Sequence, residues 1–205
     1  MNRAIIPITG NAQGRETATG MERLWDGHLR QFATPKTLTV YQPATWKLNT
    51  RRRMEQLQRL HIEHVFFVGY SHGQAAIMEM CRMAPRYGIR TIQIALCDPV
   101  GRNPLLPRWG WAQMLSARSM TPWMRIKIPE TVSSVVWCRQ YENLPRAHEL
   151  KWNPATTHVE DALEIPVTHS QIQWSGAWFR LATEAVEAWA NPPKAIPISL
   201  RRHDQ

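Results

Sequence analysis

Short apolar runs alternate along the chain with segments whose apolar residues recur every three or four positions. The apolar runs have the length of strands: 4–9, 37–42, 64–69, 91–97 and 131–141. The periodic segments have the spacing of helices: 20–33, 50–61, 72–84 and 173–190. Such alternation predicts an α/β fold with a mainly parallel sheet, and the uninterrupted run at 64–69 indicates a central strand covered on both faces.

The pattern continues without an internal repeat or a break in composition up to about residue 190. We therefore predict a single domain over residues 1–190 of the 205-residue chain. The remaining segment, 191–205, reads NPPKAIPISLRRHDQ and is rich in proline and polar residues. This composition predicts an extended C-terminal tail.

The chain is basic, with 25 Lys and Arg against 16 Asp and Glu, which gives a net charge of +9. The basic residues are spread along the sequence, and only 51–53 and 201–202 form local runs. Neither zinc-finger spacing nor an aromatic RNA-binding motif accompanies them. We interpret the charge as solvated surface and expect no specific nucleic-acid partner.

Cysteine usage and the N-terminus both favour a reducing compartment. Cys81, Cys97 and Cys138 are far apart and form no Cys-x-x-Cys motif, which predicts buried thiols rather than a disulfide framework. The apolar stretch before Gly10 is too short for a signal peptide, and no run has the length of a membrane span. The expected location is cytoplasmic.

The strand-like run at 64–69 ends in Gly69-Tyr70-Ser71-His72-Gly73, and a helical pattern follows. A serine on a sharp turn from strand to helix adopts a strained backbone conformation that exposes its hydroxyl group. Glycines two positions before and after it relieve crowding, and the next helix directs its N-terminus at the serine. The stretch therefore fits the nucleophile elbow Gly-x-Ser-x-Gly in its required context.

On this motif and the strand–helix order of residues 4–190, the chain resembles the α/β-hydrolase superfamily in a compact, cutinase- or lipase-like form. The resemblance implies a three-layer fold with a mainly parallel central sheet. It also implies a catalytic triad in the chain order Ser, Asp or Glu, His. A serine needs a base to take its proton, and the base needs a carboxylate to orient it.

The resemblance gives the acid two candidates. Asp98 follows the strand-like run at 91–97 in the sequence Asp98-Pro99-Val100-Gly101, which is similar to the acid turn of several lipases. Glu142 follows the next run, where many other hydrolases of this fold place the acid. We prefer Asp98, although an aspartate before proline is also a common turn residue.

In the family order the base follows the serine, which excludes His28, His61 and His64. His203 lies in the tail and His72 directly follows the serine, so the remaining candidates for the base are His148, His158 and His169. His169 follows a short apolar segment and precedes the closing helix, where the family carries its histidine on a loop. His158 lies in a polar stretch and is the second choice. We therefore predict His169 as the base, on its location rather than on its residue type.

The resemblance also implies an oxyanion hole and a substrate-binding segment. The backbone N–H of His72 should supply one donor, and Gly10 or Asn11, after the first strand, should supply the second. The segment 101–129 is long and apolar and leaves the sheet beside Asp98, so we interpret it as a lid or cap, with extra core packing as the alternative. The predicted substrate-contacting residues are Trp109, Trp111 and Tyr70.

Together these features predict a serine hydrolase that cleaves a carboxylic ester through an acyl-enzyme intermediate. Its partner would be a small-molecule or lipid ester, and no cofactor or metal is expected because the histidines and cysteines lack metal-ligand spacing. Thioesterase, acyltransferase, amidase or peptidase chemistry would use the same residues. A non-catalytic binding protein on the hydrolase fold is the remaining alternative.

Overall fold

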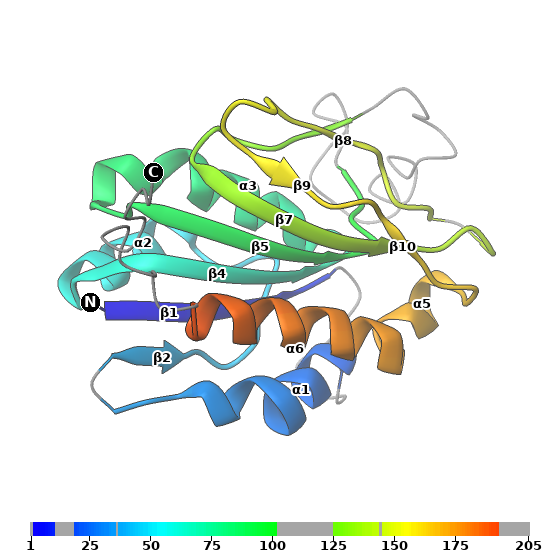
Figure 1. Ribbon diagram of the computed structural model, residues 1–205, viewed down its shortest axis with the longest axis horizontal. Coiled ribbons are helices and arrows are strands. Elements are labelled where there is room, and N and C mark those ends of the chain that lie inside the picture. Colours follow the sequence, from blue (N-terminus) through cyan, green and yellow to red (C-terminus); the bar gives the residue numbers. More distant parts are fainter. Residues whose placement is uncertain (1, 11–18, 36, 102–124, 144, 193–205) are drawn as a thin grey trace, which may run out of the picture.

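The chain folds around an eight-stranded parallel sheet, and Figure 1 shows its strands side by side. The computed structural model describes residues 2–10, 19–35, 37–101, 125–143 and 145–192. The strand order is β10-β7-β5-β4-β1-β2, with β3 beside β1 and β9 beside β7, and all of these pairs are parallel. The predicted α/β class with a mainly parallel sheet is confirmed.

The strands of this sheet are β1 (Asn2–Thr9), β2 (Leu38–Val40), β3 (Ala44–Thr45), β4 (Ile62–Tyr70), β5 (Thr91–Cys97), β7 (Val132–Arg139), β9 (His158–Val159) and β10 (Leu163–Glu164). A separate two-stranded sheet pairs β6 (Ile126–Lys127) with β8 (Leu150–Lys151). The helices are α1 (Gly20–Leu24), α2 (Thr50–Arg59), α3 (Gly73–Met83), α5 (His169–Ile172) and α6 (Gly176–Ala190).

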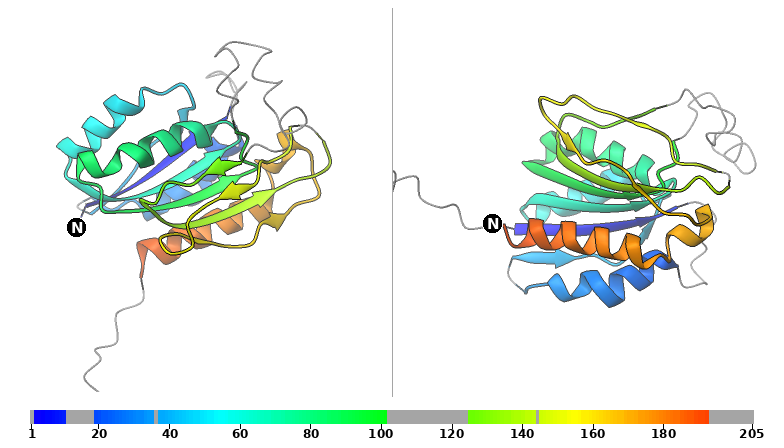
Figure 2. Two further views of the ribbon diagram at one scale, coloured as in Figure 1. Left: turned by 90° about the horizontal axis from the view of Figure 1, so that it is seen from above. Right: turned by 45° about the vertical axis from the view of Figure 1, so that its right-hand side comes forward.

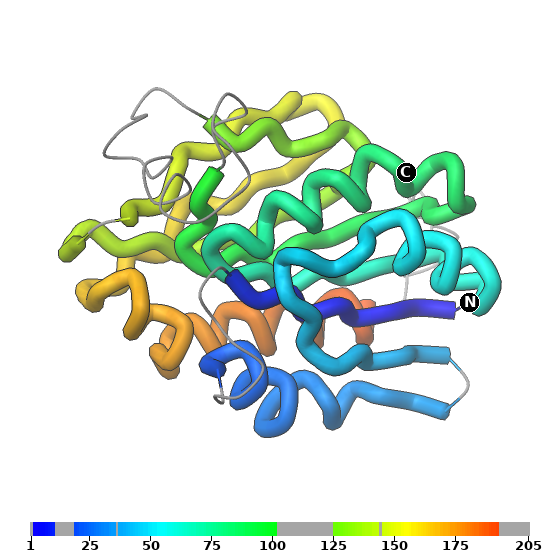
Figure 3. Tube along the Cα trace, turned by 180° about the vertical axis from the view of Figure 1, so that it is seen from behind, coloured from blue at the N-terminus to red at the C-terminus, as the bar shows by residue number. Residues whose placement is uncertain are grey.

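Helices cover both faces of the sheet, so the fold has three layers. Helices α2 and α3 pack on one face, over a core that includes Ile8, Phe67 and Ile94. Helices α1 and α6 pack on the other face, over Ile5 and Phe66. Figure 2 shows the two helical layers on either side of the sheet, and Figure 3 shows α2 and α3 from behind. Strands β1 and β4 are buried from both faces, as the apolar run at 64–69 predicted.

Two of the predicted helices differ from their expected form. The segment 20–33 forms α1, a π-helical turn (Trp25–Leu29) and a 3₁₀ turn (Arg30–Phe32), and the weak helix formers Asp26 and Gly27 lie at the change. The segment 173–190 becomes helical only from residue 176, because the Ser175 hydroxyl accepts a hydrogen bond from the Ala177 N–H and caps α6.

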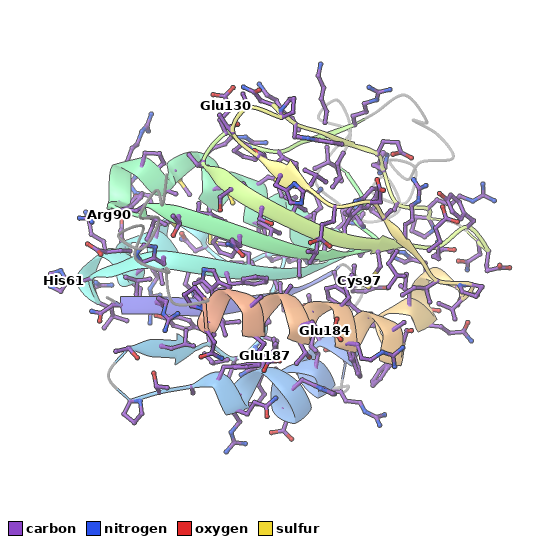
Figure 4. The ribbon with its side chains drawn as sticks, in the orientation of Figure 1. His61, Arg90, Cys97, Glu130, Glu184 and Glu187 are labelled. Carbon is purple, nitrogen blue, oxygen red and sulfur yellow. The ribbon has the colours of Figure 1, made fainter. Side chains whose placement is uncertain are left out.

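The carboxyl ends of the strands meet at one edge of the sheet, and the chain changes direction there. From β1 the chain goes to β2 on one side, whereas from β4 it goes to β5 on the other. In open α/β sheets, ligands bind outside the strand ends at such a switch point. In Figure 4, Cys97 lies toward this edge and His61 and Arg90 lie at the opposite one.

Candidate active site

Ser71 lies on a sharp turn between β4 and α3. Its φ angle is 50°, in the left-handed region that residues with a side chain seldom adopt. The turn is fixed by a 3.0 Å hydrogen bond from the Ser71 N–H to the carbonyl of Cys97 at the end of β5. A serine held in a strained conformation at the edge of a sheet is a feature that functional sites share.

Gly69 and Gly73, which flank Ser71, each make space for a neighbouring helix or strand. A Cβ atom on Gly73 would lie 2.5 Å from the carbonyl oxygen of Ile8 in β1, which is backbone. A Cβ atom on Gly69 would lie 2.5 Å from the Cδ1 atom of Ile77 in α3. The absence of side chains therefore lets α3 start directly against β1 and β4, with its N-terminus at Ser71.

His169 places its imidazole against Ser71, although it lies 98 residues further along the chain. Its Nε2 atom lies 2.9 Å from Ser71 Oγ. His169 is the first residue of α5, whose N-terminus is closed by a capping box between Thr168 and Gln171. The short helix holds the imidazole over the nucleophile turn, and the side chain of His169 is 13% exposed.

Asp98 supplies a carboxylate to the other nitrogen of the same imidazole. Its Oδ2 atom lies 2.5 Å from His169 Nδ1, and its side chain is fully buried. Its φ angle is also positive, at 44°, and its N–H donates to the carbonyl of Cys138 at 2.8 Å. The backbone N–H groups of Gln140 and Ala147 each donate to Oδ1 at 3.2 Å. A buried carboxylate with several hydrogen-bond donors is held in one orientation.

The competing candidates differ from Asp98 and His169 in burial or position. Glu142 is exposed. His158 is also exposed, and it pairs with Ser134 in β7. Ser134 lies four residues before Cys138, so His158 is about 13 Å from the carboxyl ends of the strands, at ~3.3 Å per residue. His148 is fully buried, and its Nδ1 atom accepts a 2.9 Å hydrogen bond from the N–H of Gly101. The hydrogen bonds described for the His169 ring are with Ser71 and Asp98.

The backbone at the end of β1 packs against Ser71. A Cβ atom on Gly10 would lie 2.8 Å from the Cβ of Ser71, so the strand end packs directly against the nucleophile. His72 is the N-cap residue of α3, where the helix dipole favours a negative oxygen. Asn11, Trp109 and Trp111 lie outside the described residues, as does most of the segment 101–129.

Tyr70 lies against His169 rather than on open surface. It is 3% exposed, and its hydroxyl donates to the His169 carbonyl at 2.7 Å. The two rings stack with centroids 5.2 Å apart. Burial raises the pKa of Tyr70 well above its usual range, and the nearby Cys97 and Asp98 act in the same direction. The hydroxyl therefore keeps its proton and donates at all ordinary pH values, while a substrate contact for Tyr70 stays a prediction.

Two polar residues near Asp98 were not foreseen from the sequence. The buried Gln140 amide nitrogen donates to Asp98 Oδ2 at 3.1 Å, and its oxygen accepts from the Asn143 N–H at 3.1 Å. The Asn143 side-chain oxygen accepts from the His169 N–H at 2.8 Å. In the sequence these residues look like any polar loop after a strand, and only their position after the strand next to Asp98 offers a signal.

Other kinds of site find less support in the part of the chain that the structure describes. There, no three His, Cys, Asp or Glu side chains gather as metal ligands would. The three cysteines are buried free thiols. Among the described helices, none has the length and apolar character needed to cross a membrane.

Comparisons with known proteins find a likeness in structure but no match in sequence. No family model and no curated protein matches the sequence. A solved covalent complex of the NocB thioesterase domain with a fluorophosphonate nocardicin G analogue is 15% identical, with a TM-score of 0.45. The alignment covers 94% of this chain and 96% of that one. The fold class rests on the chain's own parallel sheet between two helical layers.

Proposed function

We propose that this protein is a serine hydrolase that cleaves a carboxylic ester through an acyl-enzyme intermediate. The observation that supports it most is the unbroken relay from Ser71 Oγ to His169 Nε2 at 2.9 Å and from His169 Nδ1 to Asp98 Oδ2 at 2.5 Å. A nucleophile, a base and an orienting acid in hydrogen-bond contact are the arrangement that activates a serine hydroxyl.

Each residue has a defined part in the proposed reaction. Ser71 Oγ attacks the ester carbonyl while His169 Nε2 takes its proton, and a C–O bond forms as the carbonyl oxygen becomes negative. Asp98 stabilises the resulting imidazolium. His169 then returns the proton to the leaving alcohol as its C–O bond breaks, and water repeats the sequence to release the acid and free Ser71.

The negative oxygen of the tetrahedral intermediate needs donors that are already in place. We assign the first to the backbone N–H of His72, at the start of α3, where the helix dipole adds a favourable field. The second comes from the strand end at Gly10, whose lack of a side chain lets the backbone approach Ser71, or from Asn11 beyond it. Removal of one such donor typically costs 10²–10³-fold in rate.

The experiment is a panel of p-nitrophenyl esters of increasing acyl length, with a thioester of the same acyl group alongside. The wild-type protein should turn over one or more esters, and Ser71→Ala and His169→Ala should each lose most of that turnover. Triad members act together, so the double variant should be barely slower than either single variant. Faster cleavage of the thioester at matched acyl length would move the activity to thioesters. Turnover that persists in Ser71→Ala would contradict the proposal.

A further inference from the structure

We infer that Asn143, together with Gln140, is a positioning residue that holds His169 in register with Asp98 and Ser71. The inference rests on the proposed function of these three residues. Asn143 itself does not touch Ser71, so its effect on the reaction would pass through His169.

The evidence is a closed circuit of four hydrogen bonds. The His169 N–H donates to the Asn143 side-chain oxygen at 2.8 Å, and the Asn143 N–H donates to the Gln140 side-chain oxygen at 3.1 Å. The Gln140 amide nitrogen donates to Asp98 Oδ2 at 3.1 Å, and that same oxygen contacts His169 Nδ1 at 2.5 Å. The loop after β7 thus holds both the backbone and the ring of His169.

The orientation of the Gln140 amide is fixed by its surroundings. Its nitrogen faces Asp98 Oδ2 and also the carbonyls of Asn143 and Pro145, at 3.0 and 2.9 Å. If the amide were reversed, its oxygen would face three acceptors, and the Asn143 N–H would face a donor. Gln140 is 1% exposed, so water does not offer an alternative partner.

Tyr70 also holds His169 in place. Its hydroxyl donates to the His169 carbonyl, and its ring stacks on the imidazole. Three groups of His169 are therefore fixed: the N–H by Asn143, the carbonyl by Tyr70 and Nδ1 by Asp98. A base held at three points keeps the geometry that proton transfer needs, and small displacements at such a site lower rates strongly.

Asn143 offers a clean test because it is exposed, and exposed substitutions usually change folding stability little. The chain also contains a matched control. Asn153 is exposed too, and its side-chain oxygen accepts a 3.1 Å hydrogen bond from the N–H of Ala155, away from the triad. Asn143→Ala and Asn153→Ala each remove a side-chain oxygen that accepts from a backbone N–H, and Asn153→Ala also removes an exposed 3.3 Å hydrogen bond to Glu130.

The experiment compares kcat and KM of the full chain for its best p-nitrophenyl ester. Asn143→Ala should lower kcat by about 3- to 10-fold with KM nearly unchanged, the loss expected for one hydrogen bond that orients a base. Asn153→Ala should behave as wild type. Asn143→Asp keeps the acceptor and should restore kcat, and its negative charge should move the rising limb of the pH–rate profile upward by a few tenths of a pH unit, since it favours the imidazolium.

The results separate this inference from the proposed function. If the wild-type protein is active and Asn143→Ala matches Asn153→Ala in kcat, the inference is overturned. If Asn143→Ala does not fold, Asn143→Asp decides, and a pH profile identical to that of wild type overturns it. If the wild-type protein is inactive, the proposed function fails, while the downfield NMR signal of the His169 Nδ1 proton still reports positioning: broadening in Asn143→Ala but not in Asn153→Ala supports the inference, and an unchanged signal overturns it.

Discussion

The backbone N–H of Val100 donates to the carbonyl of Ser71 at 3.3 Å and joins the loop of the acid to the turn of the nucleophile. The Val100 carbonyl in turn accepts a 3.1 Å hydrogen bond from the side chain of Gln74, in the first turn of α3. Gln74 is 4% exposed and Val100 is fully buried. The distance between Ser71 and Asp98 is therefore set by local buried contacts as well as by the sheet.

Replacement of Gln74 by leucine should destabilise the fold. The variant keeps most of the side-chain volume but leaves the buried Val100 carbonyl without its donor, which costs about 1–3 kcal/mol of unfolding free energy. Urea denaturation measures the change. The control is Gln58→Leu, at an exposed position on α2, and equal stability of the two variants would show that the buried bond contributes nothing.

The tight start of α3 can be tested with two glycines. In Gly73→Ala the new methyl group would meet the Ile8 carbonyl oxygen at 2.5 Å, and backbone cannot move aside as a side chain can. We expect a loss of about 1–3 kcal/mol in unfolding free energy and a large drop in turnover. Gly27→Ala is the control, because no atom lies within 4 Å of its added Cβ. A Gly73→Ala protein as stable and active as Gly27→Ala would contradict the structure of the elbow.

The choice of acid leads to a paired prediction. Asp98→Asn keeps the shape of the side chain but favours the wrong imidazole tautomer, so kcat should fall on the order of 10³-fold or more. Glu142→Gln should leave kcat within about twofold, because Glu142 is exposed. Steady-state kinetics with one ester decide the matter. The reverse ranking would transfer the role to Glu142.

Buried thiols predict a loss of stability at alkaline pH. Burial raises the pKa of Cys81 and Cys97, and a hydrogen bond with Cys138 raises that of Cys97 further. The unfolded chain therefore loses thiol protons first, at a pH of about 8.5, and the stability present below that pH is lost above it.

Each of these thiols should contribute a slope of about 1.4 kcal/mol per pH unit to the fall in unfolding free energy. Urea titrations under reducing conditions between pH 7 and 10 measure it. In Cys81→Ala the slope should be smaller by the contribution of one thiol, about 1.4 kcal/mol per pH unit. The same slope in wild type and Cys81→Ala would show that Cys81 ionises equally in both states.

The sequence predicted the central sheet well because the signals there are local. The runs that became β1, β4, β5 and β7 are apolar and long, and each ends where chemistry-bearing residues were expected. The strands β3, β6, β8, β9 and β10 were not predicted, since each has only two residues and no periodicity. Their pairing depends on partners far away in the chain.

The candidate site likewise contains residues that the sequence predicts and residues that it does not. Ser71, Asp98 and His169 could be proposed from a motif, a strand end and chain order. The circuit through Gln140 and Asn143 could not, because polar residues in a loop carry no local sign of what they contact. Tyr70 shows the same limit: its hydrogen-bond partner His169 is 99 residues away, and its contact with substrate stays a prediction.

The most direct test of the proposed function is the mass of the protein during turnover of a p-nitrophenyl ester. Acid quenching within the first turnovers should trap a species heavier than the free chain by one acyl group, and peptide mapping should place that group on Ser71. The species should be absent from Ser71→Ala and should form far more slowly in His169→Ala. An active protein that carries no acyl group at any time, or carries it on another residue, would contradict the account.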